Sequence, residues 1–277
     1  MSNNFITFSM YLKKKINDLM DLFKISHLKK PLKRLIFSKI ELDPDSGSDD
    51  YNWDLYHRDY EKQIKGMSVN STLKLKEGDF YFKEDKLILK EGLLPLHKNH
   101  TALYEVVGKL KPKSIIEIGC GGGDHLHNIG VLYPFIKKRG FDRSISQLSF
   151  LEKRSPELSQ YVETLDITLP PSNKTPTADI VYSQAVIMHI QSSNSHLVAL
   201  ANMFRMALKS VVLMENFNRH NFVDDINMLH KKGMIDWQNI NFYIHKIENK
   251  PHILIISKEE IEMEKLNRYQ DLLIAMD

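Results

Sequence analysis

The sequence lacks most of the features that mark secreted and membrane-spanning proteins. It has one cysteine, Cys120, in 277 residues, so no disulfide can form within the chain and a reducing compartment is expected. No uncharged apolar run reaches the ~18 residues that a transmembrane helix requires. Three lysines, Lys13 to Lys15, follow the first apolar stretch, and no signal-peptide core comes after them. These absences predict a cytoplasmic location.

The net charge is low, but it is unevenly distributed. The formal charge is +3. Residues 1–40 contain nine Lys or Arg against two Asp, whereas the rest of the chain contains 29 Lys or Arg against 33 Asp or Glu. A mildly acidic body is poorly suited to binding a phosphate backbone, so DNA is not an expected partner.

The basic segment, residues 1–40, is predicted to be a helical arm. Leu12, Ile16, Leu19 and Phe23 follow helical spacing, with lysines between them. Three interpretations stay open: packing on the body or on a second subunit, contact with an anionic membrane surface at its inner face, and a nucleic-acid arm.

Residues 41–99 are predicted to form a linker and a cover or lid. Residues 41–52 are acidic and rich in turn formers, which is typical of a linker. Trp53, Tyr56 and Tyr60 then recur on one helical face. Such a stripe is usually part of a core, but Tyr56 and Tyr60 are also candidates for substrate contact.

Residues 100–277 are predicted to form one α/β domain. Strand and helix signals alternate, which favours a mostly parallel sheet with helices on both faces. Two closing strands, separated by four residues, predict a hairpin and therefore one antiparallel strand. The expected strands are 114–118, 138–142, 161–165, 179–186, 210–214, 241–247 and 252–257, with helices at 124–133, 146–153, 195–208 and 222–232.

A glycine cluster, IIEIGCGGGDH at 115–125, is the strongest local signal. Gly119, Gly121 and Gly123 permit unusual backbone angles and a close approach of a ligand. They follow a strand, and ligands of parallel sheets bind at the carboxyl ends of strands. A dinucleotide site would need a further glycine at Asp124, where a carboxylate would repel a pyrophosphate.

Two further acids bear on the identity of the cofactor. Glu117, just before the glycine loop, favours a cofactor with a positive charge and an amino group, and S-adenosylmethionine has both. Asp142 comes 19 residues after Gly123, at the end of the second strand. A carboxylate there can accept hydrogen bonds from both ribose hydroxyls, which fits either cofactor class.

The motif EIGCGGG resembles the first motif of class I S-adenosylmethionine-dependent methyltransferases. GFD with Asp142, LDI with Asp166, the strand ADIVYSQAV and the closing hairpin extend the resemblance over residues 100–257. It implies a Rossmann-like seven-stranded sheet in the order 3-2-1-4-5-7-6, with strand seven antiparallel and a helical N-terminal extension.

The same resemblance implies roles for individual residues. The three glycines line the methionine part of the cofactor, and Glu117 acts through that motif. Asp142 holds the ribose, Asp166 and Ile167 flank the adenine, and Gln184 lies near the methyl donor.

Candidate acceptor residues follow the fourth and fifth strands. The segment MENFNRHNF contains His220, the favoured general base, and Arg219, which could hold an anionic acceptor. His189 is a second candidate base, although a histidine there is often structural. Glu215 and Asn216 complete the predicted acceptor cluster, and no metal site is evident.

The acceptor is predicted by exclusion. The Asn/Asp-Pro-Pro-aromatic signature of amino-methyltransferases is absent, and YSQA stands in its place. The aromatic stripe, EIGCGGGDH and the EN-x-x-RH segment more loosely resemble bacterial surface-polysaccharide methyltransferases, which implies O-methylation of a sugar or glycan intermediate. The alternatives are a small-molecule or RNA methyltransferase and a catalytically silent S-adenosylmethionine-binding scaffold.

Overall fold

The computed structural model describes residues 74–93, 95–170, 175–267, 269 and 272, and the account below concerns these residues. The predicted arm, the linker and the aromatic stripe with Tyr56 and Tyr60 lie outside them. None of the helices in the described residues has the length and hydrophobicity of a membrane span.

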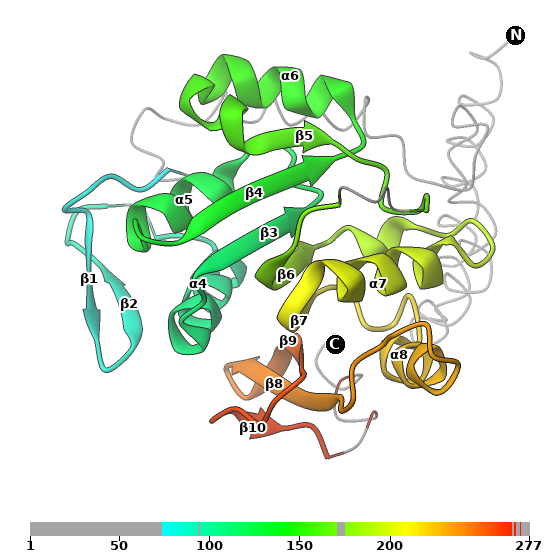
Figure 1. Ribbon diagram of the computed structural model, residues 1–277. Coiled ribbons are helices and arrows are strands. Elements are labelled where there is room, and N and C mark those ends of the chain that lie inside the picture. The colour runs from blue at the N-terminus through cyan, green and yellow to red at the C-terminus, as the bar shows by residue number, and fades with distance from the viewer. Residues whose placement is uncertain (1–73, 94, 171–174, 268, 270–271, 273–277) are drawn as a thin grey trace, which may run out of the picture. The chain divides into compact units, whose positions relative to one another are not determined.

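The fold is a single mixed sheet with helices on both faces (Figure 1). A separate antiparallel hairpin precedes it. The hairpin strands are β1 (Phe80–Lys83) and β2 (Lys86–Leu89). The sheet strands are β3 (Ser114–Ile118), β4 (Lys137–Asp142), β5 (Val162–Thr164), β6 (Ala178–Gln184), β7 (Ala207–Met214), β8 (Asn241–Ile247), β9 (Lys250–Ser257) and β10 (Glu264–Lys265).

Helices alternate with the parallel strands, as the sequence predicts. The α-helices are α4 (Lys98–Leu110), α5 (Asp124–Leu132), α6 (Ile145–Arg154), α7 (Ser195–Met206) and α8 (Phe222–Lys231). Two 3₁₀ helices, η2 (Pro156–Tyr161) and η3 (Ile187–His189), follow α6 and β6.

The strand order is β10-β8-β9-β7-β6-β3-β4-β5, read in Figure 1 from the bottom to the top. Without β10 this is the predicted order 3-2-1-4-5-7-6, so the fold expected from the resemblance to class I methyltransferases is confirmed. The count of seven strands is wrong, because β10 adds an eighth, antiparallel to β8. A strand of two residues is too short to show alternation and cannot be predicted from the sequence pattern.

The two faces of the sheet bury separate hydrophobic clusters. Along β3, Ile115 packs with residues of α4 and α5, whereas Ile116 and Ile118 pack with residues of α7 and α8. This alternation follows from the two-residue period of a strand. The helices on both faces hold the strand ends, and the loops that follow them, in fixed positions.

Residues before the predicted start of the α/β domain also contribute to its core. Leu75, Leu87 and Leu96 are buried in the same cluster as Leu103 and Val106 of α4. These three leucines therefore pack on the face of the sheet that α4 covers. The domain boundary at residue 100 stays a prediction.

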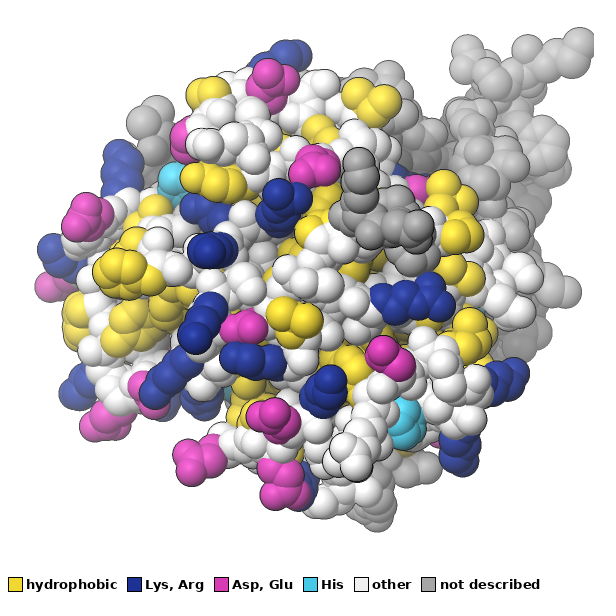
Figure 2. Space-filling model, viewed as in Figure 1, with side chains coloured by type: hydrophobic (Ala, Val, Ile, Leu, Met, Phe, Trp, Pro, Cys, Tyr) yellow, Lys and Arg dark blue, Asp and Glu magenta, His cyan; other side chains and the backbone are white. Residues whose placement is uncertain are grey.

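The surface seen in Figure 2 does not present a continuous basic area. Lys and Arg side chains, in dark blue, are interspersed with Asp and Glu side chains, in magenta. A phosphate-backbone binder needs basic residues gathered along one face. This face of the described part lacks that distribution.

Candidate functional site

A cavity of about 360 Å³ opens at the carboxyl ends of β3, β4 and β6. The strand order reverses at β3, whose neighbours are β4 and β6, and such switch points are where open α/β sheets bind ligands. The lining includes most of the predicted cofactor residues: Glu117, Gly119, Gly121, Asp142, Asp166, Ile167 and Gln184.

The glycine loop forms the wall of the cavity beside α5. Gly119 has φ of 73°, and a Cβ there would overlap the Val186 side chain. Gly121 has φ of 47°, and a Cβ there would meet only Gln147 Oε1, at 3.6 Å, so the backbone leaves open space on the ligand side. Gly123 is not among the lining residues; it packs against α6, and Gly122 lines the cavity instead.

Glu117 is a buried acid without a full set of partners. Its side chain lies at the cavity and the residue is 2% exposed, and Oε2 has no hydrogen-bond partner within the described part of the chain. Burial raises the pKa of Glu117 well above its usual value, the nearby Tyr182 hydroxyl opposes the rise, and the charges of Asp124 and Asp142 add to it. Such a carboxyl is a strong site for a cationic group that enters the cavity.

Asp142 ends β4 and is fixed by backbone donors. Its Oδ2 accepts from the N–H of Gly121 at 2.9 Å, and its Oδ1 accepts from the N–H of Ser144 at 2.8 Å. Burial raises the pKa of Asp142, and these two hydrogen bonds oppose the rise. Each carboxylate oxygen retains a second lone pair, so the group can still accept from a ligand hydroxyl.

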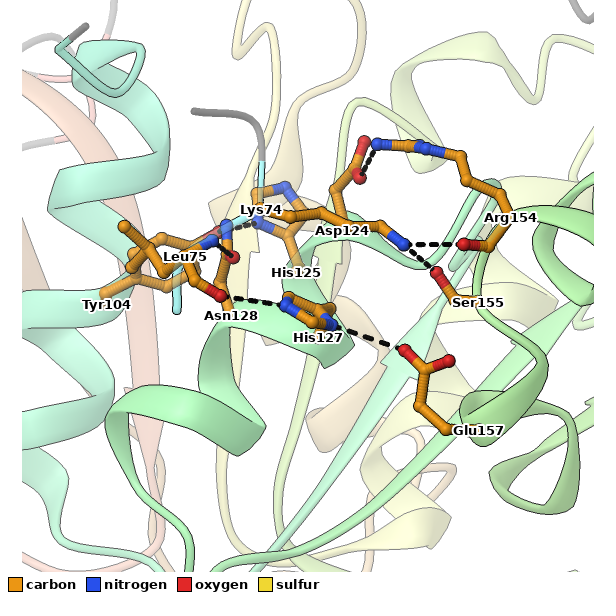
Figure 3. Close-up of polar contacts among 10 residues, drawn as sticks. All are labelled: Lys74, Leu75, Tyr104, Asp124, His125, His127, Asn128, Arg154, Ser155 and Glu157. Carbon is orange, nitrogen blue, oxygen red and sulfur yellow. Dashed lines mark hydrogen bonds and ion pairs between the residues drawn. The ribbon is translucent and has the colours of Figure 1, made fainter. Parts of the chain in front are cut away.

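Asp124 does not present a free negative charge to the cavity, contrary to what the sequence suggests. Its carboxylate forms an ion pair with Arg154 of α6, and both side chains are largely buried (Figure 3). The negative charge of Asp124 is therefore compensated. Repulsion of a pyrophosphate rests instead on Glu117 and Asp142.

Asp166 and Ile167 border the cavity after β5, where the resemblance places adenine. Asp166 Oδ1 accepts from the N–H and the hydroxyl of Thr168, at 2.9 and 2.6 Å. Ile167 is 7% exposed and offers an apolar contact. One polar and one apolar side chain at the same end fit a heteroaromatic ring.

Two histidines, His100 and His125, line the cavity. The sequence suggests that His100 could close over the cofactor, whereas His125 was missed as a site residue. His125, in the first turn of α5, hydrogen bonds to Gln184 Oε1, and its ring lies 4.6 Å from that of His100. Burial lowers the pKa of His100 to about 3 and also lowers the pKa of His125, so both rings are neutral. A histidine directly after a glycine loop, in GGGDH, is the signal that could have identified His125.

The predicted acceptor cluster after β7 is largely turned away from the cavity. Glu215 is 4% exposed and accepts from Ser183 Oγ at 2.7 Å and from the backbone N–H groups of Val186, Ile187 and Met188. It therefore holds the start of η3 in place and has no lone pair directed at a substrate. Asn216 accepts from the N–H of Asn218 in a local turn.

His220 does not fit the role of general base that the sequence predicts for it. It is absent from the lining, its Nε2 donates to the Ile187 carbonyl at 3.0 Å, and its ring stacks on His196 with centroids 4.1 Å apart. His189 does line the cavity. Burial, and then the charge of Arg219, lower the pKa of His189, so the geometry favours it as the neutral imidazole at the site.

A metal centre has no support in the described part of the chain, where no group of three or more His, Cys, Asp or Glu side chains is arranged to hold an ion. The expectation that no metal is used stays a prediction.

Comparisons with known proteins find only distant similarities. No protein-family model matches the chain, and neither does any curated protein. Among solved structures, DesVI of Streptomyces venezuelae is 16% identical, with 42% of this chain and 49% of that one covered and a TM-score of 0.36.

Two further structures have methyltransferase descriptions. CalS10, an amino pentose methyltransferase from Micromonospora echinaspora with bound SAM, is 18% identical, with 43% and 51% covered and a TM-score of 0.36. The N-methyltransferase NodS from Bradyrhizobium japonicum, in complex with S-adenosyl-l-homocysteine, is 14% identical, with 59% and 87% covered and a TM-score of 0.42. The chain spans about half the length of DesVI and CalS10. Similarities of this size carry no information about activity.

Proposed function

We propose that this chain is an S-adenosylmethionine-dependent methyltransferase. The observation that carries the proposal is the buried carboxyl of Glu117, whose Oε2 lacks a partner in the described part of the chain, beside a glycine loop with open space at Gly121. S-adenosylmethionine has an ammonium group and a sulfonium, which together match an acidic cavity. A pyrophosphate would meet the carboxyl groups of Glu117 and Asp142 at the same place.

The residues present fit this cofactor. Glu117 would hold the amino group, Gly119 and Gly121 would approach the methionine backbone, and Asp142 would accept from the ribose hydroxyls. Asp166 and Ile167 would flank the adenine. The bound cofactor supplies an activated methyl group on sulfur; the chain supplies orientation and exclusion of water.

His189 is the proposed base of the reaction. An alcohol acceptor must lose its proton during methyl transfer, and a neutral imidazole is suited to take it. Burial and the Arg219 charge keep His189 neutral at physiological pH. Arg219 is the proposed contact for an anionic part of the acceptor.

The proposed acceptor is a sugar or glycan intermediate of bacterial surface-polysaccharide synthesis, methylated on oxygen. Support comes from the resemblance carried by EIGCGGGDH and EN-x-x-RH, and from the aromatic residues Tyr56 and Tyr60.

Residues 1–40 are proposed to bring a cytoplasmic enzyme to the inner face of a membrane or to a second subunit. Reversing the charge of Lys13, Lys14 and Lys15 to Glu should then reduce sedimentation with anionic vesicles; unchanged sedimentation would exclude the membrane role.

Calorimetry with S-adenosylmethionine and with NAD tests the cofactor assignment. Asp142→Asn should weaken S-adenosylmethionine binding by roughly 10- to 100-fold, because hydrogen bonds to a charged group are lost. Asp179→Asn is the matched control: Asp179 accepts from the Lys113 N–H at 2.8 Å and from Lys209 Nζ at 3.1 Å, outside the cavity lining. Binding of NAD but not S-adenosylmethionine, or equal effects of both variants, would overturn the proposal. Cofactor binding without any methyl transfer would favour the silent scaffold.

A further inference from the structure

A chain of buried hydrogen bonds joins the backbone of Leu75 to the cavity. Figure 3 shows most of its members, with Leu75, Asn128, Tyr104 and His125 close together between α4 and α5. The Leu75 N–H contacts Asn128 Oδ1 at 2.8 Å, and Asn128 Nδ2 contacts Tyr104 Oη at 2.9 Å. Tyr104 Oη contacts His125 Nδ1 at 3.1 Å, and His125 Nε2 contacts Gln184 Oε1. This series of hydrogen bonds therefore ends at Gln184, which lines the cavity.

The first member of this chain fixes the direction of the next bonds. A backbone N–H can only donate, so the Asn128 amide must turn its oxygen toward Leu75. The Asn128 nitrogen then donates to Tyr104 Oη. We assign the hydroxyl hydrogen of Tyr104 to its bond with His125 Nδ1.

The same logic fixes His125 and Gln184. A neutral His125 whose Nδ1 accepts must carry its hydrogen on Nε2, where it donates to Gln184 Oε1. Burial lowers the pKa of His125, which agrees with a neutral ring. The His100 ring, at 4.6 Å and 71° to His125, supports this position from the side. The bond from His125 fixes the orientation of the Gln184 amide, so its NH₂ group is held in place as a donor to a ligand.

We propose that Tyr104 and His125 are positioning residues that hold Gln184 as a hydrogen-bond donor in the cavity, near the methyl donor, so that the site selects a hydroxyl oxygen over an amine. The proposal rests on the methyltransferase function above. A hydroxyl oxygen has two lone pairs, one for attack on the methyl carbon and one to accept from Gln184. A neutral amine has one lone pair, which the attack uses, and its N–H groups would face the Gln184 donor unpaired.

The methyl transfer balances on this assignment. A bond forms between the acceptor oxygen and the methyl carbon, and the carbon–sulfur bond breaks. Its electron pair stays on sulfur, which becomes a neutral thioether. The hydroxyl proton passes to the neutral imidazole of His189.

Nitrogen NMR of the full-length protein with bound S-adenosylhomocysteine tests the direction of these hydrogen bonds. His125 should carry its hydrogen on Nε2 at about pH 7. Tyr104→Phe removes the donor to Nδ1 and should abolish this tautomer preference. Tyr133→Phe is the control, because it removes a hydroxyl that donates to the Tyr104 carbonyl at 2.8 Å and leaves the chain intact. An Nδ1–H tautomer in the unaltered protein, or the same response in both variants, would overturn the proposal.

Product analysis tests the choice of acceptor atom. The probes are ¹³C-methyl-labelled S-adenosylmethionine and equimolar neutral methyl glycosides and their amino-sugar counterparts. Methylation on oxygen is expected, and Gln184→Glu, which keeps the bond to His125 but loses the NH₂ donor, should lower it by roughly 10- to 100-fold. Gln184→Met also lacks the NH₂ donor and serves as a second variant in case the carboxylate of the first perturbs folding. It should lower methylation on oxygen similarly. Methylation on nitrogen, or no product from any probe, overturns the inference.

Binding of S-adenosylmethionine separates this inference from the proposed function. Tyr104→Phe should bind the cofactor within about threefold of the unaltered chain, because Tyr104 is not among the residues that line the cavity. Failure of the unaltered chain to bind S-adenosylmethionine would refute the methyltransferase itself. Normal binding with a wrong tautomer or methylated nitrogen would refute only the role of Gln184.

Discussion

Two buried glutamates near the cavity should respond in opposite ways to the same substitution. Glu117 and Glu215 are 2% and 4% exposed, at the ends of β3 and β7. Glu117 has an oxygen without a partner in the described residues, whereas Glu215 accepts hydrogen bonds on both oxygens. Substitution by Gln preserves shape and removes the charge. The comparison therefore isolates the effect of hydrogen-bond partners on a buried carboxylate.

Glu215→Gln should lower the free energy of unfolding by about 2–4 kcal/mol. The carboxylate accepts from Ser183 and from three backbone N–H groups at the start of η3. An amide offers one oxygen instead of two, and its NH₂ would face backbone donors. At ~2–4 °C per kcal/mol for a chain of this size, the unfolding midpoint should fall by roughly 4–16 °C.

Glu117→Gln should raise the free energy of unfolding of the ligand-free chain by about 1–3 kcal/mol at about pH 8. Burial raises the pKa of Glu117 above its ordinary value of 4.5, so the native state retains a proton that the unfolded state has lost. The stability from the neutral carboxyl is therefore present below that ordinary pKa and is lost as pH rises toward the raised one. The advantage of the variant should be near zero at about pH 4.5 and grow by at most ~1.4 kcal/mol per pH unit.

Urea unfolding of the two variants and the unaltered chain, at about pH 5 and about pH 8, measures both effects. Calorimetry in parallel should show that the stabilised Glu117 variant binds S-adenosylmethionine roughly 10- to 100-fold more weakly, because an amide cannot release a proton and pair with the ammonium group as the carboxyl can. The reasoning fails if both variants shift stability in the same direction, or if the effect of Glu117→Gln does not depend on pH.

Two further comparisons use matched pairs from the same site. Gly119→Ala should destabilise the fold by ~2 kcal/mol or more, because the new Cβ would overlap Val186 at a positive φ. Gly121→Ala should cost less stability and should mainly weaken cofactor binding. Thermal unfolding measures the first effect, and calorimetry measures the second. His189→Phe should reduce turnover by roughly 10²- to 10⁴-fold with cofactor affinity intact, while His220→Phe, which keeps the ring stack on its neighbour, should stay within about tenfold; the reverse order would restore His220 as the base.

The main features of the fold follow from the sequence because they depend on local pattern. Buried β-branched runs such as Ser114–Ile118 and turn residues between Asn241–Ile247 and the last long strand mark elements without reference to distant contacts. The cavity is predicted as well, since the carboxyl ends of adjacent parallel strands must meet at one edge of the sheet. Glu117, Asp142 and Gln184 are all brought there.

The hydrogen-bond partners within the site do not follow from local pattern. Leu75 and Gln184 are more than a hundred positions apart, and only the packing of α4 against α5 puts Tyr104 and His125 between them. Ser, Asn and His side chains accept many partners at similar cost, so their direction is set by whichever obligatory donor lies nearest. Here that donor is a backbone N–H of a segment outside the sheet.

Glu117 and Glu215 differ in a way that the sequence alone does not reveal. In IIEIG and VLMENF the acid ends a buried strand, and the two contexts are alike at the level of composition. They differ because the loop after β6 turns the N–H groups of residues 186–188 toward Glu215, and no such donors reach Glu117 Oε2 in the described part of the chain. An acid that its own fold satisfies supports a loop. One that the fold leaves unsatisfied remains costly until a ligand supplies the missing charge, and for that reason Glu117, rather than Glu215, is assigned to the binding site.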